Sequence, residues 1–275
     1  MSTVVRIALF QANTGIDPDK NAEALDRAAD QAAEGGAMML FTPEMSNLLD
    51  RDRERGGRNL ASERDDRVLA AMREAAARTG LWISLGSFAF ANADGSRANR
   101  AVVIDPTGEI RTSYDKIHMF DVDLADGESW RESNVYRAGD RLGLVDNTPI
   151  GRLGLSICYD VRFPALFDAL GRARCDAIAI PAAFTAPTGT AHWHILQRAR
   201  AIEASAFVIA AAQVGQHEDG RRTYGHSLVV DPWGEVLLDM GGESAGVGFA
   251  NLDLARIEEV RAQVPSLANR RAIVE

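Results

Sequence analysis

Apolar positions along the chain recur with two periods, and the switch between them marks the expected strands and helices. Residues 4–11 are mostly apolar and include β-branched side chains, which predicts a strand covered on both faces. Asp17 and Pro18 follow, and these residue types favour the N-cap and the first turn of a helix. Apolar residues then recur at helical spacing up to Gly35, so we expect the chain to open with a strand and an amphipathic helix.

The same criteria predict the remaining elements. Helices are expected to begin at Ser62, Pro164 and Ala191 and to end at Gly80, Gly171 and Glu203. Further strands are expected over residues 37–41, 81–90, 99–104, from the 105–108 turn to about 116, and over 152–157, 177–182, 207–212, 225–230, 235–238 and 247–252. On the last helix Ile195, Leu196, Ala199 and Ile202 form one apolar side, and that side, with Trp193, is predicted to face the core.

Strands and helices alternate at first, and the later strands then pair through turns such as residues 231–234. Several strands are apolar at consecutive positions, as expected where both faces of a sheet are covered. The simplest arrangement is two sheets packed together with helices outside, as one α/β domain of residues 1–275. Alternation alone suits a Rossmann-like fold equally well, and the periodicity does not decide between the two.

Composition and charge narrow the class of protein. The 275 residues carry a formal net charge of −9, so the chain is a poor binder of nucleic acid or anionic membranes, whose phosphates attract Lys and Arg. No apolar run approaches the roughly 18 residues of a bilayer span, and the first residues lack a secretory signal pattern. Two cysteines form no disulfide framework and favour a reducing compartment. These features predict a cytoplasmic globular enzyme or binding protein.

Cys158 is the first candidate for chemistry. It ends an apolar strand in the segment GLSICYDVRFP, shortly before the helix that Pro164 is expected to open. A thiol at such a strand-to-helix turn lies at the carboxyl edge of a sheet, where ligand crevices form. Helix N-terminal amides there can favour a thiolate and a developing oxyanion. The alternative is a small buried apolar residue, which is the interpretation we favour for Cys175.

A cysteine nucleophile also needs a proton acceptor and a partner for the oxyanion. Glu44 ends the apolar segment MMLFTPE, and Lys116 closes a strand in the apolar and aromatic segment YDKIHMFD. Both charges are therefore expected at the rim of a sheet. The alternatives are a solvated loop carboxylate and a solvated lysine. The five histidines are interpreted as structural or solvated side chains, at positions 118, 192, 194, 217 and 226.

Other motifs give little support for different chemistry. Residues 242–246 match GxSxG, but they lie in a glycine-rich link between two strands, whereas a nucleophile elbow needs a helix after the turn. His192 and His194 are two positions apart, so on a helix they point in different directions and form no metal pair. The sequence contains no CxxC, HExxH, Walker or GxGxxG pattern.

Glu44 in FTPE, Lys116 in YDKIHMFD and Cys158 in GLSICYDVRFP, taken in this order, resemble the motifs of the nitrilase superfamily of carbon–nitrogen hydrolases. The resemblance extends from the first predicted strand almost to the end of the chain. It implies a four-layer α-β-β-α sandwich, with these residues as the family's glutamate, lysine and cysteine. The family's additional glutamate falls on Glu132 in SWRESNVYRAGD, and Glu128 is the alternative.

The resemblance implies an amidase mechanism. Glu44 takes the proton of Cys158, and the thiolate attacks an amide carbonyl, whose oxyanion is held by Lys116 and the backbone N–H of Tyr159. Glu44 then protonates the leaving amine, so that ammonia departs and a thioester remains. Water activated by the same carboxylate releases the acid, while Glu132 positions the substrate and the lysine. These steps require no metal or organic cofactor.

Three segments look most like the Nit branch of the superfamily: AHWHILQRARAIE, AAQVGQ and TYGHSLVVDPWG. Members of that branch hydrolyse ω-amides of α-keto acids or deaminated glutathione, and the chain looks closer to the second type. Arg162 is the candidate that binds a substrate carboxylate through two hydrogen bonds, with a salt bridge to Asp160 as the alternative. Phe184 is a candidate lining residue, with a core phenylalanine as the alternative.

The same three residues would also serve other substrates, namely an N-carbamoyl amino acid, a nitrile or another aliphatic amide. The non-enzyme alternative is a nitrilase-like binding scaffold, and the intact Glu44, Lys116 and Cys158 argue against it. The expected partner is a small-molecule amide. Binding to nucleic acid or to a membrane is not expected. The resemblance further implies a homodimer or larger homo-oligomer that associates through the helices flanking the cysteine.

Overall fold

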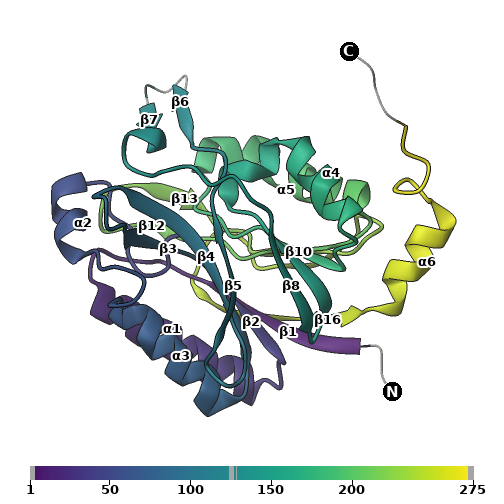
Figure 1. The fold of residues 1–275 in the computed structure, drawn as a ribbon, viewed down its shortest axis with the longest axis horizontal. Coiled ribbons are helices and arrows are strands. Elements are labelled where there is room, and N and C mark those ends of the chain that lie inside the picture. The colour runs from purple at the N-terminus through teal and green to yellow at the C-terminus, as the bar shows by residue number, and fades with distance from the viewer. Residues whose placement is uncertain (1–3, 124–126, 128, 272–275) are drawn as a thin grey trace.

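The computed structural model describes residues 4–123, 127 and 129–271, and two six-stranded sheets pack face to face within it. Figure 1 shows helices α1 and α3 outside one sheet and helices α4 and α5 outside the other. The four layers therefore follow the order α-β-β-α. This confirms the expected α/β sandwich and excludes the Rossmann-like alternative.

The first sheet is built mainly from the N-terminal half of the chain. Its order is β16 (Gly246–Asp253), β1 (Val4–Gln11), β2 (Met39–Phe41), β3 (Trp82–Ala91), β4 (Arg97–Ile104) and β5 (Ile110–Asp115). Its outer face packs against α1 (Pro18–Glu34) and α3 (Arg67–Thr79). On β1, Ile7 and Leu9 belong to the core shared with the second sheet, whereas Ala8 packs with the helices. Apolar residues on consecutive positions are thus explained by two covered faces.

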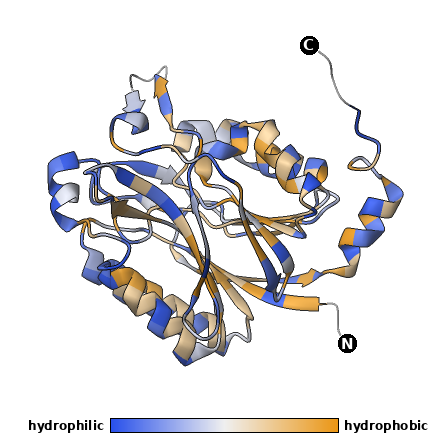
Figure 2. Cartoon of the chain, viewed as in Figure 1, coloured by the Kyte–Doolittle hydropathy of each residue, from blue (hydrophilic) through white to orange (hydrophobic). Residues whose placement is uncertain are grey.

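The second sheet repeats this plan with later strands. Its order is β15 (Val236–Asp239), β14 (Leu228–Val230), β11 (Phe207–Ala210), β10 (Ala177–Ala179), β9 (Gly151–Leu155) and β8 (Gly143–Thr148). Its outer face packs against α4 (Pro164–Arg172) and α5 (Ala186–Ala204). Figure 2 shows apolar residues gathered on the strands and on the inner sides of the helices.

The two sheets share one arrangement of parallel strands. Strands β1, β2 and β3 run parallel in the first sheet, and β9, β10 and β11 run parallel in the second, each group flanked by antiparallel strands. Glu44 lies just beyond the carboxyl end of β2, and Cys158 lies just beyond that of β9. Ligand crevices form outside the carboxyl ends of parallel strands, so this topology places both residues where a site is expected.

Shorter elements lie outside the sandwich. They are α2 (Arg53–Asn59), β6 (Asp121–Asp123), β7 (Ser129–Arg131), the 3-10 helices η1 (Glu132–Asn134) and η2 (Cys158–Arg162), β12 (Val214–Gln216), β13 (Arg222–Tyr224) and α6 (Ala255–Gln263). Helix α2 and strands β6 and β7 lie at one end of the molecule, and α6 lies at the other (Figure 1). Apart from η2, whose segment was singled out for Cys158, these elements were not predicted, because they are short and mostly polar and lack a clear period.

Three predictions about helices were wrong. Helix α5 begins at Ala186 and not at Ala191. Helix α3 is capped by Asp66, whose side chain accepts a hydrogen bond from the backbone N–H of Leu69 at 2.7 Å, whereas Ser62 lies in the preceding turn and donates to Asp65. Helix α5 does not bury the predicted apolar side: Ile195 is 70% exposed and Ile202 is 50% exposed. Its buried positions are Gly189, Trp193, Gln197, Arg200, Ala201 and Ala204.

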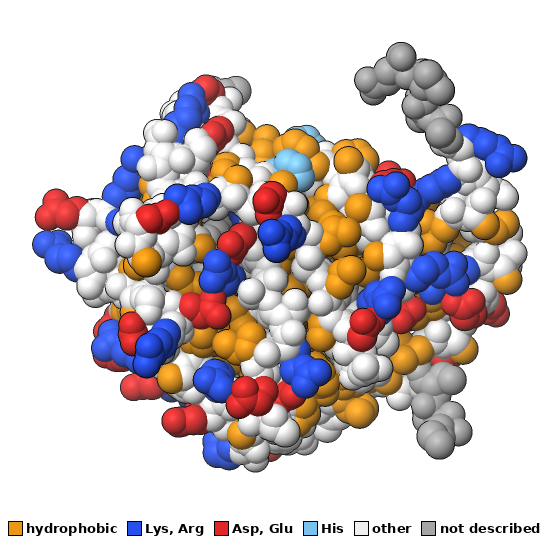
Figure 3. Space-filling view, in the orientation of Figure 1, with side chains coloured by type: hydrophobic (Ala, Val, Ile, Leu, Met, Phe, Trp, Pro, Cys, Tyr) orange, Lys and Arg blue, Asp and Glu red, His pale blue; other side chains and the backbone are white. Residues whose placement is uncertain are grey.

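Two features bear on the surroundings of the molecule. None of the helices in the described ranges is long and apolar enough to cross a membrane. Figure 3 shows acidic and basic side chains interspersed over one face of the molecule. On that face charge is not collected into one region.

Candidate active site

Four of the predicted residues meet at one cavity of about 260 Å³ at the carboxyl ends of the parallel strands. Glu44 follows β2, Lys116 follows β5, Glu132 opens η1 and Cys158 opens η2. All four side chains line the cavity. Four segments that are far apart in the sequence are therefore brought to one place by the packing of the two sheets.

Lys116 is the centre of this group. Its side chain is 2% exposed, and its ammonium Nζ lies 2.9 Å from Oε1 of Glu44 and 2.8 and 3.0 Å from the two oxygens of Glu132. Glu132 is held in turn by the backbone N–H of Phe120, which donates to Oε2 at 2.7 Å. Glu44 is buried and the Glu132 side chain is 12% exposed. Neither Glu44 nor Lys116 is therefore the solvated side chain considered as the alternative. Glu128 lies outside the described residues.

Glu44 is fixed from three directions. Its Oε1 accepts from Lys116 and from the side-chain amide of Asn99 at 3.0 Å, and its Oε2 accepts from the backbone N–H of Ala183 at 2.9 Å. The Cys158 thiol lies close enough to this carboxylate for each group to shift the pKa of the other. Glu44 thus touches both the residue that would donate a proton and the cation that would hold an oxyanion.

The loop that carries Glu44 depends on one glycine. A Cβ on Gly86 would lie 2.0 Å from the carbonyl oxygen of Thr42, so only glycine lets β3 approach this loop. The backbone N–H of Gly86 donates to the Thr42 hydroxyl, and Ser87 accepts from the backbone N–H of Met45. These contacts hold the loop on both sides of Glu44.

Asn99 was not singled out from the sequence. It lies on β4, it is fully buried, and its Nδ2 donates to both Glu44 and Glu132 at 3.0 Å. One amide therefore sets the spacing of the two carboxylates around Lys116. An asparagine in a strand carries no signal that distinguishes it from other polar strand residues, so only the fold could reveal this position.

Burial and charge set the protonation states. Burial acts to raise the pKa of Glu44, but Lys116 and the hydrogen bonds from Cys158 and Asn99 outweigh it and lower that pKa. Burial disfavours the charged form of Lys116, yet the carboxylates of Glu132 and Glu44 hold its pKa well above the usual value. At neutral pH Lys116 is therefore an ammonium beside an ionised Glu44.

Burial and the neighbouring Glu44 carboxylate raise the pKa of Cys158 well above its usual value, against the opposing effect of Lys116. The resting nucleophile is therefore a thiol. We expected helix amides to favour the thiolate, but desolvation and the negative charge are stronger here. A base next to the sulfur is consequently required, and Glu44 is in place to act as one.

Cys158 lies at a sharp turn between β9 and η2, as the sequence predicted. Its φ of 49° is in the left-handed region, which a non-glycine residue adopts only when its surroundings impose it. The backbone N–H of Cys158 donates to the carbonyl of Pro181 at 2.8 Å. Asp160 accepts from the backbone N–H of Ile157 at 2.9 Å and so closes the turn from the other side.

Asp160 also connects this turn to the segment of Lys116. The Tyr114 hydroxyl donates to it at 2.7 Å, and the backbone N–H of His118 donates to it at 3.0 Å. Its side chain is fully buried. The salt bridge between Asp160 and Arg162 that was considered as an alternative is therefore wrong, because Asp160 is occupied by these donors.

Arg162 and Phe184 lie next to each other. The guanidinium of Arg162 is 5.2 Å from the ring centre of Phe184 and 5.9 Å from that of Tyr159, and its Nη1 lies 3.2 Å from His192. Phe184 and Tyr159 both line the cavity, whereas Arg162 lies behind them and is not among the described residues that line it. Phe184 also packs against Trp193, so it is both a lining and a core residue.

Arginines at the mouth of the cavity were not predicted. Six of them line it: Arg51, Arg53, Arg97, Arg131, Arg221 and Arg222. Arg131 and Arg221 are paired with Asp123 and Asp219, and the other four make no ion pair with any described residue. The guanidiniums of Arg51 and Arg221 lie 5.3 and 5.1 Å from the ring centre of Trp130. A chain of net charge −9 thus presents a locally cationic entrance.

The remaining candidates lie elsewhere. Cys175 is buried away from the cavity, as expected, and burial raises its pKa to about 12. Ser244 of the GxSxG match lies in the link between β15 and β16, where its carbonyl accepts from Gln11. His217 is buried against Thr14 and Thr223. Across the described ranges, one His/Cys/Asp/Glu group has the spacing of a metal site, and it contains no cavity residue.

Comparison with known proteins identifies the class. Residues 6–262 match the carbon–nitrogen hydrolase family, so the chain belongs to that family. It is 38% identical over 271 residues to the deaminated glutathione amidase of Yersinia enterocolitica, which covers 97% of this chain and 93% of that protein. The crystal structure of the C. elegans NitFhit protein is 36% identical with a TM-score of 0.88, over 98% of this chain and 66% of that longer chain.

A second solved structure bears on the cysteine. A mutant of the amidase from Nesterenkonia sp. AN1 carries the acetamide moiety of fluoroacetamide covalently attached to its active-site cysteine. That amidase is 26% identical in sequence to the present chain. The two structures align with a TM-score of 0.81 over 98% of this chain and 94% of the amidase. The family and these relatives make the present chain a hydrolase. More particularly, it is a cysteine-dependent amidase of the nitrilase superfamily, as the sequence motifs predicted.

Asn99→Ala tests how far the spacing of the carboxylates matters. Because the amide lowers the pKa of Glu44, its removal should raise that pKa and move the acid limb of the rate–pH profile to higher pH. We expect kcat to fall about tenfold, as for a lost hydrogen bond to a charged group. Asn251→Ala on the exposed edge of β16 is the control and should leave the profile unchanged. If the acid limb of the Asn99→Ala profile does not shift, Asn99 does not set the pKa of Glu44.

Proposed function

We propose that the protein hydrolyses a linear amide of a small carboxylate-bearing molecule through a thioester on Cys158. The observation that carries the proposal is the Glu44 carboxylate, which contacts both the thiol and the Lys116 ammonium in one cavity. Base, nucleophile and cation are the three groups that acyl transfer from an amide requires. A binding scaffold without activity has no chemical need for all three.

The first half-reaction transfers the acyl group to sulfur. Glu44 takes the thiol proton of Cys158 as the sulfur attacks the amide carbon, and the carbonyl oxygen becomes an oxyanion. Lys116 and the backbone N–H of Tyr159 hold that oxyanion, and one such donor contributes about 3 kcal/mol to lowering the barrier. Glu44 then gives its proton to the nitrogen, the C–N bond breaks and the amine or ammonia departs.

The second half-reaction returns the enzyme to its resting state. Glu44 takes a proton from a water molecule, the hydroxide attacks the thioester, and the acid leaves as the sulfur recovers its proton. Lys116 remains an ammonium throughout, since both carboxylates stabilise its charge. Glu132 positions Lys116 and the substrate. No step requires a metal or an organic cofactor.

The proposed substrate is deaminated glutathione or an ω-amide of an α-keto acid. The name of the Yersinia relative supports the first of these. Four cavity arginines make no ion pair with a residue that the structure describes, and they support an anionic substrate, because guanidinium groups bind carboxylates through paired hydrogen bonds. An N-carbamoyl amino acid, a nitrile and a neutral aliphatic amide are the alternatives. Ammonia release across a substrate panel, with carbon dioxide measured in parallel, distinguishes them.

Glu44→Gln tests the proton transfer. Glutamine keeps the shape but cannot accept the thiol proton, so kcat/KM should fall by about 10³-fold and no thioester should accumulate. Mass spectrometry of acid-quenched wild type should show the acyl mass on the peptide that contains Cys158. The exposed Glu243→Gln is the matched control and should behave as wild type. Turnover by a Cys158→Ala variant, or wild-type rates in Glu44→Gln, would contradict the mechanism.

Arg162→Ala tests carboxylate recognition. If Arg162 binds the substrate carboxylate, this variant should raise KM about tenfold or more for carboxylate-bearing amides and leave neutral amides nearly unchanged. Arg222→Ala is the matched variant, because Arg222 lines the cavity and has no ion pair within the described part of the chain. If Arg222→Ala raises KM selectively for carboxylate-bearing amides and Arg162→Ala does not, Arg162 does not bind the substrate carboxylate. Initial rates with one anionic and one neutral amide give the answer.

We also propose a homodimer or larger homo-oligomer that associates through α4 and α5, in the cytoplasm. The exposed Ile195 and Ile202 on α5 support the interface, because residues seven positions apart lie on the same face of a helix and adjoining exposed apolar side chains mark sites of association. The two cysteines, both free and buried, are compatible with a reducing compartment.

Ile195→Glu tests the interface. A charge at the centre of an apolar contact should shift the sedimentation coefficient to that of the 275-residue monomer at micromolar concentration. Met38→Glu is the control, since Met38 is 51% exposed just before β2, in the sheet that does not carry α4 and α5. A wild-type protein that sediments as a monomer, or an Ile195→Glu variant that still associates, would contradict this interface.

A further inference from the structure

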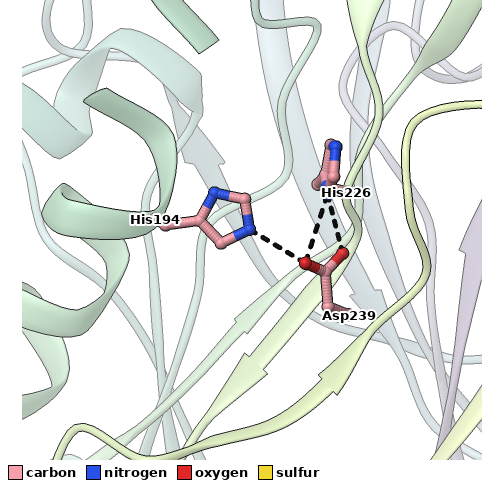
Figure 4. Close-up of side chains that lie close together, drawn as sticks. All are labelled: His194, His226 and Asp239. Atoms are coloured by element: carbon pink, nitrogen blue, oxygen red, sulfur yellow. Dashed lines mark hydrogen bonds and ion pairs between the residues drawn. The ribbon is translucent and has the colours of Figure 1, made fainter. Parts of the chain in front are cut away.

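Three side chains from separate elements meet outside the catalytic cavity. His194 projects from α5, His226 precedes β14, and Asp239 ends β15 (Figure 4). None of the three lines the catalytic cavity. Their positions in the sequence are too far apart for spacing to reveal the group, and His194 alone was judged only against its neighbour His192.

The three side chains direct their polar atoms at a common point. Nε2 of His194 lies 2.9 Å from Oδ2 of Asp239, and Nδ1 of His226 lies 2.9 Å from Oδ1. One ligand atom from each residue lies within 4.8 Å of the other two. Figure 4 shows both imidazole rings turned toward the carboxylate from different sides. Two imidazole nitrogens and one carboxylate oxygen are the donor set of many protein sites for first-row transition metals.

The group is held in place by contacts that do not depend on Asp239 alone. The ring of Tyr224 stacks on that of His226 at 4.4 Å, and the indole N–H of Trp193 donates to the His226 carbonyl at 2.8 Å. Asp239 accepts from the backbone N–H of Gly241 at 2.9 Å. Such outer contacts orient ligands in known metal sites.

The backbone of His226 is strained in a way that this orientation explains. Its φ of 54° is in the left-handed region, and a Cβ on Gly242 would lie 3.1 Å from its Nε2. A histidine is therefore kept in a costly conformation, with a glycine making room for its ring. Strain of this kind clusters at binding sites, because the site and not local preference determines the backbone.

We propose that His194, His226 and Asp239 bind a divalent transition-metal ion, for which Zn²⁺ is the probe. Ligand atoms that lie about 2.0–2.2 Å from Zn²⁺ in tetrahedral geometry are roughly 3.3 Å from one another. Side-chain rotations that move the donor atoms by about 1 Å would therefore bring them to the distances that the ion requires. Each imidazole would bind the ion through the nitrogen that faces Asp239, in the neutral tautomer whose other ring nitrogen carries the proton. The fourth position is taken by water or by another ligand.

Such an ion would join α5 to the end of β15. The side chains of His194, His226 and Asp239 are each between 24% and 34% exposed, so an ion can reach them from solvent. The bound ion would neutralise part of the charge on a chain of net −9. Because α5 also carries Thr188 of the cavity wall, metal binding would fix one wall of the cavity without entering it.

Isothermal titration of the full chain with ZnCl₂ tests the site. Cys158→Ala is the background for every variant, because a buried thiol next to Glu44 is itself a zinc ligand. We expect one ion per chain, with affinity reduced at least tenfold in His194→Ala and in Asp239→Asn. His192→Ala is the matched control, since this histidine lies on the same helix outside the group and should leave zinc affinity unchanged.

Co²⁺ gives a second measurement that does not depend on stability. Bound to two imidazoles and a carboxylate in tetrahedral geometry, it should absorb strongly in the visible region, and the band should be lost in Asp239→Asn. Circular dichroism verifies that each variant is folded. Absence of stoichiometric Zn²⁺ binding, or affinity retained in both His194→Ala and Asp239→Asn, would overturn the proposal.

Discussion

The buried ammonium of Lys116 is the group on which the rest of the site depends. An ion taken from water into a protein interior loses several kcal/mol of solvation, and an unpaired lysine at this depth would give up its proton. Glu44 and Glu132 offset that loss through contacts of 2.8 to 3.0 Å. Lys116 in turn keeps Glu44 ionised. Removing any one of the three would leave charges that the surrounding apolar residues could not stabilise.

The same arrangement explains why the nucleophile is generated only when it is used. Burial and the Glu44 carboxylate oppose ionisation of Cys158 more strongly than Lys116 favours it, so its pKa is high. Transfer of the proton to Glu44 removes one negative charge at the moment the sulfur becomes nucleophilic. The resting thiol is thereby protected from reaction with solvent oxidants, while the base that activates it already lies beside it in the same cavity.

The sandwich makes this group possible because each sheet supplies part of it. Glu44 and Lys116 come from the first sheet, and Cys158 comes from the second. Two side chains that carry no catalytic atoms connect the parts: Asn99 bridges the two carboxylates, and Asp160 connects the cysteine turn to the segment of Lys116. Precise placement of the reacting groups thus rests on hydrogen bonds across the sheet interface.

The sequence by itself determined the elements with a strong period, such as β1 and α1, and the turn at Cys158, because these follow from local preferences of the backbone. Motifs around Glu44, Lys116 and Cys158 identified the family before any coordinates. Tertiary structure alone decided the roles of other residues: the bridging Asn99, the arginines at the cavity mouth, the exposed side of α5 and the group around Asp239. The physical reason is that a polar side chain's role depends on which distant segment it meets, and that meeting is set by the packing of whole layers and not by its neighbours in sequence.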